Sequence, residues 1–266
     1  MYDKGSLPYE WHQELFDYSR EKGLIPFSSV FDYEGLDFLL KLDIPILKIS
    51  SYEANDPNFV ETVLDTGIPT FISIGGLLSS EFERLIEKVD NSNNKQVVIL
   101  NCLSAYPAPM SEFNFKRTSK LINKYGLLTG LSDHSIDEKA AIISLALGAK
   151  VFEKHVTLSD SDNIADKSFS SDIKKFSNYC KSIRDAEKGL KNDEINPQQS
   201  EIPNLFLKRS IVATETIQPG EIFDENNIGV KRPNVGLEPY HFNDLIGRKS
   251  INHYSPGDGI DSIELS

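Results

Sequence analysis

Residues 127–155 read LLTGLSDHSIDEKAAIISLALGAKVFEKH and contain a complete strand–helix–strand pattern. The apolar runs 127–131 and 151–154 predict strands, and the spacing of apolar residues within 137–147 predicts a helix between them. Parallel strands joined by one crossover helix end at the same edge of a sheet. We therefore expect His134 and His155, which follow the two strands, to lie side by side where such sheets and barrels bind ligands.

Two neighbouring imidazoles suit a divalent metal ion. Neutral histidine is a common ligand of borderline metals, and two protein ligands leave coordination positions open for water and substrate. The alternative is that His134 and His155 are unrelated polar residues at strand ends. Their matching positions after consecutive strands favour a shared site.

The same alternation extends over residues 1–190. Nearly all-apolar strands that alternate with amphipathic helices predict an α/β domain with a parallel sheet covered by helices. A closed (β/α)8 barrel has eight strands, whereas this chain offers about six, and its first helix has no strand before it. The pattern therefore predicts either an open sheet or a barrel without its beginning. The expected strands are 26–31, 44–50, 70–74, 97–102, 127–131 and 151–154, and the expected helices are 11–22, 35–42, 58–66, 80–89, 115–125, 137–147 and 176–190.

A polar stretch that contains two prolines, residues 191–206, predicts a linker. Short β-like segments and frequent turn residues then predict a small β-rich domain over residues 207–266, with strands at 210–213, 228–231 and 250–251. A domain of this size is too small to be an ordinary enzyme by itself.

The 266 residues carry a net charge of −12, which argues against a nucleic-acid partner because the phosphates would be repelled. An acidic surface does not exclude an anionic substrate, and Lys48, Lys154 and Arg232 are candidates for a locally positive pocket. Cys102 and Cys180 are the only cysteines, so we expect no disulfide framework and a reducing compartment. The sequence shows neither a targeting segment nor an apolar run of membrane-spanning length, so we expect a cytoplasmic protein without a membrane partner.

Lys48 lies within an apolar strand, where an unpaired ammonium group is costly. It should therefore face either the carboxylate of Glu53 or an anionic ligand, and the segment leaves both open. Cys102 has no activating base in its own segment and is expected to be a packed thiol. Small hydroxyls also recur near the strand ends, where they can bind phosphate or carboxylate oxygens. These are Ser28, Ser29, Ser50, Ser51, Ser73, Ser104 and Ser132.

Three further residues are candidates for contact with a hydroxyl-rich ligand. Tyr106, in the rigid segment YPAP, can stack on a sugar or hydrogen-bond to it, although packing is the commoner role of a single tyrosine. Asp166 lies in residues 162–170, which we expect to form a loop over the site. Arg232 lies in the stiff basic turn KRP, which suits a carboxylate or a hydroxyl-rich ligand; the alternative is a solvated turn.

Together, five motifs resemble the N-acetylneuraminate (sialic acid) synthase family, which includes legionaminic and pseudaminic acid synthases. The motifs are GLSDH at 130–134, EKH at 153–155, KISS at 48–51, YPAP at 106–109 and KRP at 231–233. The resemblance implies a TIM-type (β/α)8 barrel joined to a C-terminal SAF domain, which is similar to type III antifreeze protein. Residues 209–249 resemble that second domain throughout.

The resemblance also implies a reaction. Members of the family condense phosphoenolpyruvate with an N-acetylmannosamine-type sugar, giving a sialic (nonulosonic) acid and phosphate, with Mn²⁺ or Mg²⁺ as cofactor. By this likeness His134 and His155 would be the metal ligands, and Glu53, Asp166 and Arg232 would be catalytic. The substrate-binding residues would be Ser29, Lys48, Ser51, Ser73, Ser104, Tyr106 and Ser132.

In the family, the residue that corresponds to Arg232 reaches from one subunit into the barrel of its partner, which implies a domain-swapped homodimer. Family members also begin with two strands that this chain lacks, and those strands carry a glutamate and a lysine near phosphoenolpyruvate. The resemblance therefore implies an N-terminally truncated barrel with two unpaired sheet edges. Two alternatives stay open: a non-catalytic remnant or one half of a split synthase that binds sugar or partner subunits, and a lyase that forms a Schiff base on Lys48.

Overall fold

The computed structural model describes residues 7–158, 166–191 and 193–261. The chain divides into two compact units, residues 1–192 and 193–266. Each unit has its own hydrophobic core, so each is considered separately.

The first unit is built on one six-stranded sheet in which the strands follow one another in chain order. Every neighbouring pair is parallel, so each connection is a crossover that carries a helix. This confirms the α/β alternation predicted from the apolar runs. The strands are β1 (Ser28–Val30), β2 (Leu47–Ile49), β3 (Thr70–Ser73), β4 (Val97–Cys102), β5 (Leu128–Asp133) and β6 (Val151–Lys154).

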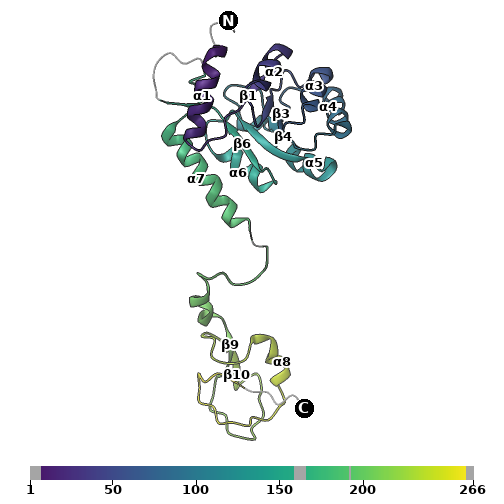
Figure 1. Ribbon diagram of the computed structural model, residues 1–266. Helices are drawn as coiled ribbons and strands as arrows, with labels where there is room; N and C mark the ends of the chain where they lie inside the picture. Colours follow the sequence, from purple (N-terminus) through teal and green to yellow (C-terminus); the bar gives the residue numbers. More distant parts are fainter. Residues whose placement is uncertain (1–6, 159–165, 192, 262–266) are drawn as a thin grey trace. The chain divides into compact units, whose positions relative to one another are not determined.

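Helices α2 to α5 follow one another around the outside of the sheet (Figure 1). The core lies between sheet and helices, where Ile49 and Ile99 of the sheet belong to one buried cluster with Val60, Leu64 and Leu85 of the helices. Such a winding of strands inside and helices outside is that of a (β/α)8-type barrel. The helices are α1 (Tyr9–Glu21), α2 (Tyr33–Leu40), α3 (Pro57–Asp65), α4 (Ser79–Asn91), α5 (Lys116–Tyr125), α6 (Lys139–Ala146) and α7 (Ile173–Gly189).

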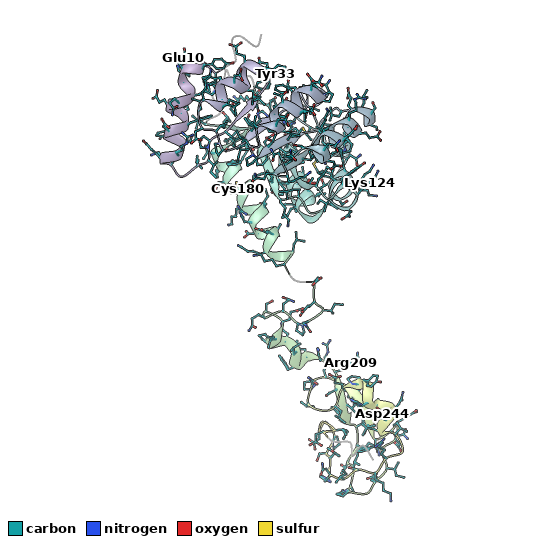
Figure 2. The ribbon with its side chains drawn as sticks, turned by 45° about the vertical axis from the view of Figure 1, so that its right-hand side comes forward. Glu10, Tyr33, Lys124, Cys180, Arg209 and Asp244 are labelled. Carbon is teal, nitrogen blue, oxygen red and sulfur yellow. The ribbon has the colours of Figure 1, made fainter. Side chains whose placement is uncertain are left out.

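Aspartate side chains begin three of these helices, α2, α3 and α7. Asp32 accepts a hydrogen bond from the Gly35 N–H at 2.7 Å, and Asp56 accepts one from Asn58 at 3.0 Å at the start of α3. Helix α1 packs against α2 through Tyr9, whose ring is stacked on Phe38 with centroids 4.2 Å apart. Figure 2 labels the adjoining residue on α1, Glu10.

The sheet curves around one of its faces. Side chains alternate between faces along a strand, and the register places Lys48 of β2 and Glu153 of β6 on the same face. Their Nζ and Oε2 atoms lie 3.7 Å apart although three strands separate β2 from β6 in the sheet. The face is therefore concave, as in part of a barrel. At its two edges, β1 and β6 have no neighbouring strand among the described residues.

The second unit is a small β-rich fold, as the turn-rich sequence predicted. Strands β9 (Ser210–Ala213) and β10 (Ile228–Lys231) pair antiparallel, and η3 (Ile202–Leu207) and α8 (Phe242–Leu245) flank them. The expected strand at 250–251 is wrong. The Ser250 hydroxyl bonds to the Asn252 carbonyl at 2.6 Å, so this segment turns instead of extending.

Candidate functional site

His134 and His155 lie one residue beyond the ends of β5 and β6, as the repeated pattern predicted. The centroids of their rings are 5.3 Å apart, and the ring planes are inclined by 53°. The last backbone pair of the two strands is Asp133 with Lys154. The next residue on each strand therefore points to the concave face, and the crossover through α6 (Lys139–Ala146) brings the two imidazoles together.

In both rings Nδ1 is the nitrogen that lies near an oxygen atom of another described residue. His134 Nδ1 lies 3.0 Å from the Leu103 carbonyl oxygen, an arrangement in which Nδ1 carries the proton and Nε2 keeps its lone pair. His155 Nδ1 lies 3.5 Å from Asp166 Oδ2. The described residues contain no group of three or more histidine, cysteine, aspartate or glutamate side chains arranged to hold a metal. A metal here would therefore take two imidazole nitrogens from the described part of the chain and keep other positions open.

The two imidazoles differ in their affinity for protons. Burial, followed by the nearby His134, lowers the pKa of His155. Burial also acts to lower the pKa of His134, but hydrogen bonds with Cys102 and the Leu103 carbonyl outweigh it, and the pKa is raised. His155 is therefore the more readily neutral of the pair.

Cys102 is buried, as expected of a packed thiol, but it also touches the histidine pair. Its Sγ lies 3.8 Å from His134 Nδ1 and 3.8 Å from the Ser104 hydroxyl. Burial would raise the pKa of the thiol, and the contact with His134 overcomes this, so that the pKa of Cys102 is lowered. Cys102 is therefore more than a packed residue. Its own segment does not reveal this, because its polar partner, His134, follows a different strand.

Aromatic rings cover the histidines. The ring centroid of Tyr106 lies 4.2 Å from that of His134, and Phe169 lies 4.9 Å from His155 and 4.8 Å from Tyr106. Burial raises the pKa of Tyr106 to about 12, so its phenol stays neutral and can donate a hydrogen bond. Together these rings form an apolar wall beside the imidazoles.

Lys48 is buried on the concave face, with 6% of its side chain exposed. Its Nζ donates to the Ile49 carbonyl at 3.1 Å and lies 3.7 Å from the Glu153 carboxylate. Burial lowers the pKa of Lys48, and Glu153 partly opposes this. Of the two partners that the sequence left open for Lys48, Glu53 accepts a hydrogen bond from the Ser50 hydroxyl, and the carboxylate that pairs with Lys48 is that of Glu153.

Several of the expected hydroxyls converge beside Lys48. Ser51 accepts a hydrogen bond from the Gly75 N–H at 2.9 Å, and a Cβ added at Gly75 would touch Ser51, Cys102 and Ser104. The hydroxyl of buried Ser73 has no hydrogen-bond partner among the described residues. The loops that follow β2, β3 and β4 thus meet in one small cradle that a side chain at Gly75 would fill.

Two hydroxyls of the expected set lie on the strands around this cradle. Ser132 donates to Glu153 at 2.6 Å from the adjacent strand. Ser29 shares a face with Lys48, because the two residues are partners in the β1–β2 register. The unpartnered Ser73 hydroxyl, the Lys48 ammonium group and the open backbone at Gly75 make this end of the sheet suitable for an anion.

Comparison with known proteins agrees with this architecture. The NeuB family matches residues 1–194, and the SAF domain matches residues 208–261. The chain belongs to the NeuB family. Pseudaminic acid synthase of Campylobacter jejuni (strain 81-176) is 35% identical over 260 residues, which cover 98% of this chain and 76% of that protein. Pseudaminic acid synthase of Helicobacter pylori is 36% identical over 252 residues, covering 94% of this chain and 74% of the relative.

Among solved structures, the spore coat polysaccharide biosynthesis protein SpsE of Bacillus subtilis is similar to this NeuB family chain. It matches with a TM-score of 0.68 and 30% identity, covering 98% of this chain and 79% of the other. The matched residues include parts of both units. No helix among the described residues of the chain has the length and apolarity needed to cross a membrane.

In this NeuB family chain the remaining expected residues lie on loops. Asp166 is largely exposed beside His155, Glu53 is half-buried, and Arg232 is exposed in the second unit. Of the expected loop over the site, residues 162–165 lie outside the described residues.

Sequence reasoning missed Glu153 and Phe169, and it wrongly assigned Lys154 to the pocket. Glu153 could have been found from strand alternation, because it stands two residues before His155 and so shares its face. By the same rule Lys154 faces the other side, where it is buried against Asp133 at 3.4 Å. Phe169 carries no local signal, since its contact with His155 depends on how the chain returns after β7 (Val156–Thr157).

Proposed function

We propose that this chain joins phosphoenolpyruvate to an N-acetylated amino sugar of the mannosamine type, giving a nonulosonic acid and phosphate. One observation carries the proposal: the paired imidazoles of His134 and His155 face the same concave surface as buried Lys48 and its hydroxyl cradle. A metal-binding pair beside an anion-binding group is what this condensation needs. Membership in the NeuB family, with relatives named pseudaminic acid synthase, supports a product of the pseudaminic acid class.

The metal in this proposal is Mn²⁺ or Mg²⁺, and His134 and His155 would hold it through their Nε2 atoms. The fit rests on ring orientation, because Nδ1 of each ring faces an oxygen acceptor and leaves Nε2 for the ion. When bound, such an ion would polarise the sugar aldehyde and a water molecule as a Lewis acid. Tyr106 and Phe169 would limit the access of bulk water to the same place.

Lys48 and the hydroxyl cradle would bind phosphoenolpyruvate. One N–H of Lys48 bonds to the Ile49 carbonyl, so its remaining donors can reach a phosphate or carboxylate oxygen. The unpartnered hydroxyl of Ser73 and the small space around Gly75 suit the same anion. These residues would therefore hold the enol in place while carbon 3 reacts.

In the reaction proposed, carbon 3 of phosphoenolpyruvate forms a bond with the aldehyde carbon of the open-chain sugar. Water adds to carbon 2, and phosphate leaves from the resulting tetrahedral centre, so that a 2-keto acid remains. The aldehyde oxygen takes up a proton and becomes a hydroxyl. Asp166, which contacts His155, and Glu53, beside the cradle, are the carboxylates proposed to move protons at the sugar and the reacting centre.

We further propose that the active form is a homodimer in which Arg232 of one chain serves the site of its partner. The residue is exposed on the basic turn that follows β10, where a guanidinium can reach a carboxylate bidentately. The two free cysteines suit a reducing, cytoplasmic location.

A direct assay tests the reaction. The chain is incubated with phosphoenolpyruvate, Mn²⁺ and a panel of N-acetylated hexosamines, and released phosphate and the product mass are measured. We expect phosphate release that depends on both sugar and metal and is abolished by His134→Ala with His155→Ala. His253→Ala, an exposed histidine in the second unit, is the matched control and should keep full activity. Sugar-independent phosphate release, or none with any sugar, would contradict the proposal.

A second candidate is binding without independent catalysis, and the open sheet edges favour it. Strands β1 and β6 lack a neighbour among the described residues, and a closed barrel has eight strands. The test adds in trans the part of the Campylobacter jejuni synthase that this chain does not cover. Phosphate release only after this addition would support one half of a split enzyme. Retained Mn²⁺ binding without release in either case would support a non-catalytic binding protein.

A further inference from the structure

A buried ion pair lies directly behind the two histidines. Asp133 and Lys154 are the last register partners of β5 and β6, and each immediately precedes one histidine. Their side chains are 0% and 1% exposed, and Lys154 Nζ lies 3.4 Å from Asp133 Oδ2. Because side chains alternate along a strand, the pair occupies the face opposite to the imidazoles.

Both members of the pair hold the backbone just after His134. Asp133 Oδ1 accepts a hydrogen bond from the Ser135 N–H at 2.8 Å, and Lys154 Nζ donates to the Ser135 carbonyl. Lys154 therefore links the end of β6 to the residue that follows His134. This link lies beyond the last backbone pair of the two strands, in the region where the two imidazoles project.

Helix α7 covers the pair. Lys154 Nζ lies 5.3 Å from the ring centroid of Tyr179, which is 4% exposed, and this distance suits a cation–π contact. Burial, together with the charge of Asp133, raises the pKa of the Tyr179 phenol. The ammonium group thus contacts a carboxylate, a carbonyl and an aromatic face, all shielded from water.

Such a pair is a poor way to gain stability alone. Removing two charges from water is costly, and apolar side chains of similar volume commonly serve stability equally well. The pair does supply a directional hydrogen bond. Lys154 donates to the Ser135 carbonyl, and an apolar side chain could not do so. No register pair between β5 and β6 includes His134 or His155. Their backbone carbonyls accept hydrogen bonds from Ala108 and Ser171, whereas the bond from Lys154 to Ser135 joins the two strand ends to each other.

We propose that Lys154, paired with Asp133, is a positioning residue that sets the distance and orientation of the two imidazoles for a shared metal ion. The inference deepens the proposed function and rests on it, since it concerns the same metal site. Lys154 acts through the strand ends and touches neither substrate nor metal. Its loss should therefore weaken the site without removing a ligand.

The test uses the full chain with the neutral double variant Asp133→Asn with Lys154→Met. Asparagine can still accept the Ser135 N–H, and methionine fills the space of the lysine stem, so no lone buried charge remains. We expect an unfolding temperature close to that of the wild type and a dissociation constant for Mn²⁺ about 10- to 100-fold higher by calorimetry. The visible absorption spectrum of bound Co²⁺ should also change, because it reports ligand geometry. Glu61→Gln with Lys88→Met, which removes an ion pair between outer helices, should leave both readouts unchanged.

Asp133→Asn alone separates the contributions, because Lys154 can still bond to the Ser135 carbonyl. Its Mn²⁺ affinity should lie closer to the wild type than to the double variant; equal affinities in the two variants would overturn the role of Lys154. If the wild type binds no Mn²⁺, the metal part of the proposed function fails. The positioning role of Lys154 is then tested on the metal-free protein. There, ¹⁵N NMR of the imidazoles should show altered His134 and His155 signals in the double variant, and unchanged signals would overturn the inference.

Discussion

Lys48 and Glu153 meet across the concave face of the sheet, with Nζ and Oε2 3.7 Å apart. The lysine is buried and the carboxylate is partly exposed, so the pair is open toward solvent on one side only. Ser132 holds the other carboxylate oxygen at 2.6 Å. Lys48 is thus presented to the concave face with its charge only partly neutralised.

Replacing Lys48 tests its part in anion binding. Lys48→Met keeps the length of the stem and removes the charge, and hydrogen bonds from a charged donor contribute about 1.5–3 kcal/mol each. We expect the KM for phosphoenolpyruvate to rise about 10- to 100-fold, while the unfolding temperature does not fall, because a buried ammonium is costly to desolvate. Steady-state phosphate release measures the first, and calorimetric unfolding the second. Lys88→Met on α4 is the control, and an unchanged KM in Lys48→Met would contradict the assignment.

Metal affinity should depend on pH through His134. Only neutral imidazoles bind a metal, and the pKa of His134 is raised while that of His155 is lowered. As pH falls, His134 therefore takes up its proton first, and below that pKa the affinity for Mn²⁺ should drop about tenfold per pH unit. Calorimetric titration with Mn²⁺ over a pH series measures the pH at which this loss of affinity begins, which is the midpoint of the His134 titration.

Cys102 should influence the pH at which His134 takes up its proton and Mn²⁺ affinity falls. Its contact with His134 Nδ1 contributes to the raised pKa, so Cys102→Ala should move the midpoint to lower pH. Cys180→Ala is the matched control, since that thiol is exposed on α7, where Figure 2 labels it. A midpoint that stays in place in Cys102→Ala would show that the thiol does not influence the imidazole.

Replacing glycine by alanine should lower the stability of the protein at Gly130 and raise it at Gly189. A Cβ at Gly130 would lie 2.5 Å from the Val151 carbonyl oxygen and 2.6 Å from Leu100, so Gly130→Ala forces β5 and β6 apart. Overpacking of this kind costs about 1–3 kcal/mol of unfolding free energy. Gly189, at the end of α7, has open space around its Cβ position, and Gly189→Ala should add about 0.5–1 kcal/mol.

Urea unfolding followed by fluorescence measures both changes, because Trp11 is the single tryptophan and lies on α1 of the first unit. Gly130→Ala should also weaken Mn²⁺ binding, since it separates the strands that carry the histidines. Equal unfolding midpoints for the two variants would contradict the packing argument.

The proposed dimer is tested by mixing two inactive chains. His155→Ala lacks a metal ligand, and Arg232→Ala lacks the guanidinium offered to the partner. If Arg232 acts across the dimer, subunit exchange should restore about a quarter of the wild-type activity, because half of the dimers then hold one complete site. If Arg232 acts within its own chain, the mixture stays inactive. Phosphate release before and after exchange distinguishes the two cases.

Much of the fold was accessible from local pattern. Residues 97–102 were predicted as a strand and coincide with β4, because a buried parallel strand is apolar along most of its length. The prediction for residues 151–154 also coincides with β6, although that strand carries Glu153 and Lys154. The same reasoning placed His134 beside His155, since a single crossover leaves little freedom for the two strand ends. Where local side-chain bonds compete with an extended backbone, as at Ser250, the short β-like signal was wrong.

The polar contacts of the site could not be predicted in the same way. Spacing along a strand determines which side chains share a face, and it would have assigned Glu153 to the site and Lys154 to the opposite side. Which groups then meet across the concave face depends on how strongly the six strands curl. That curl belongs to the whole sheet and not to any one segment, so only the tertiary structure decided that Lys48 meets Glu153 and that Cys102 meets His134.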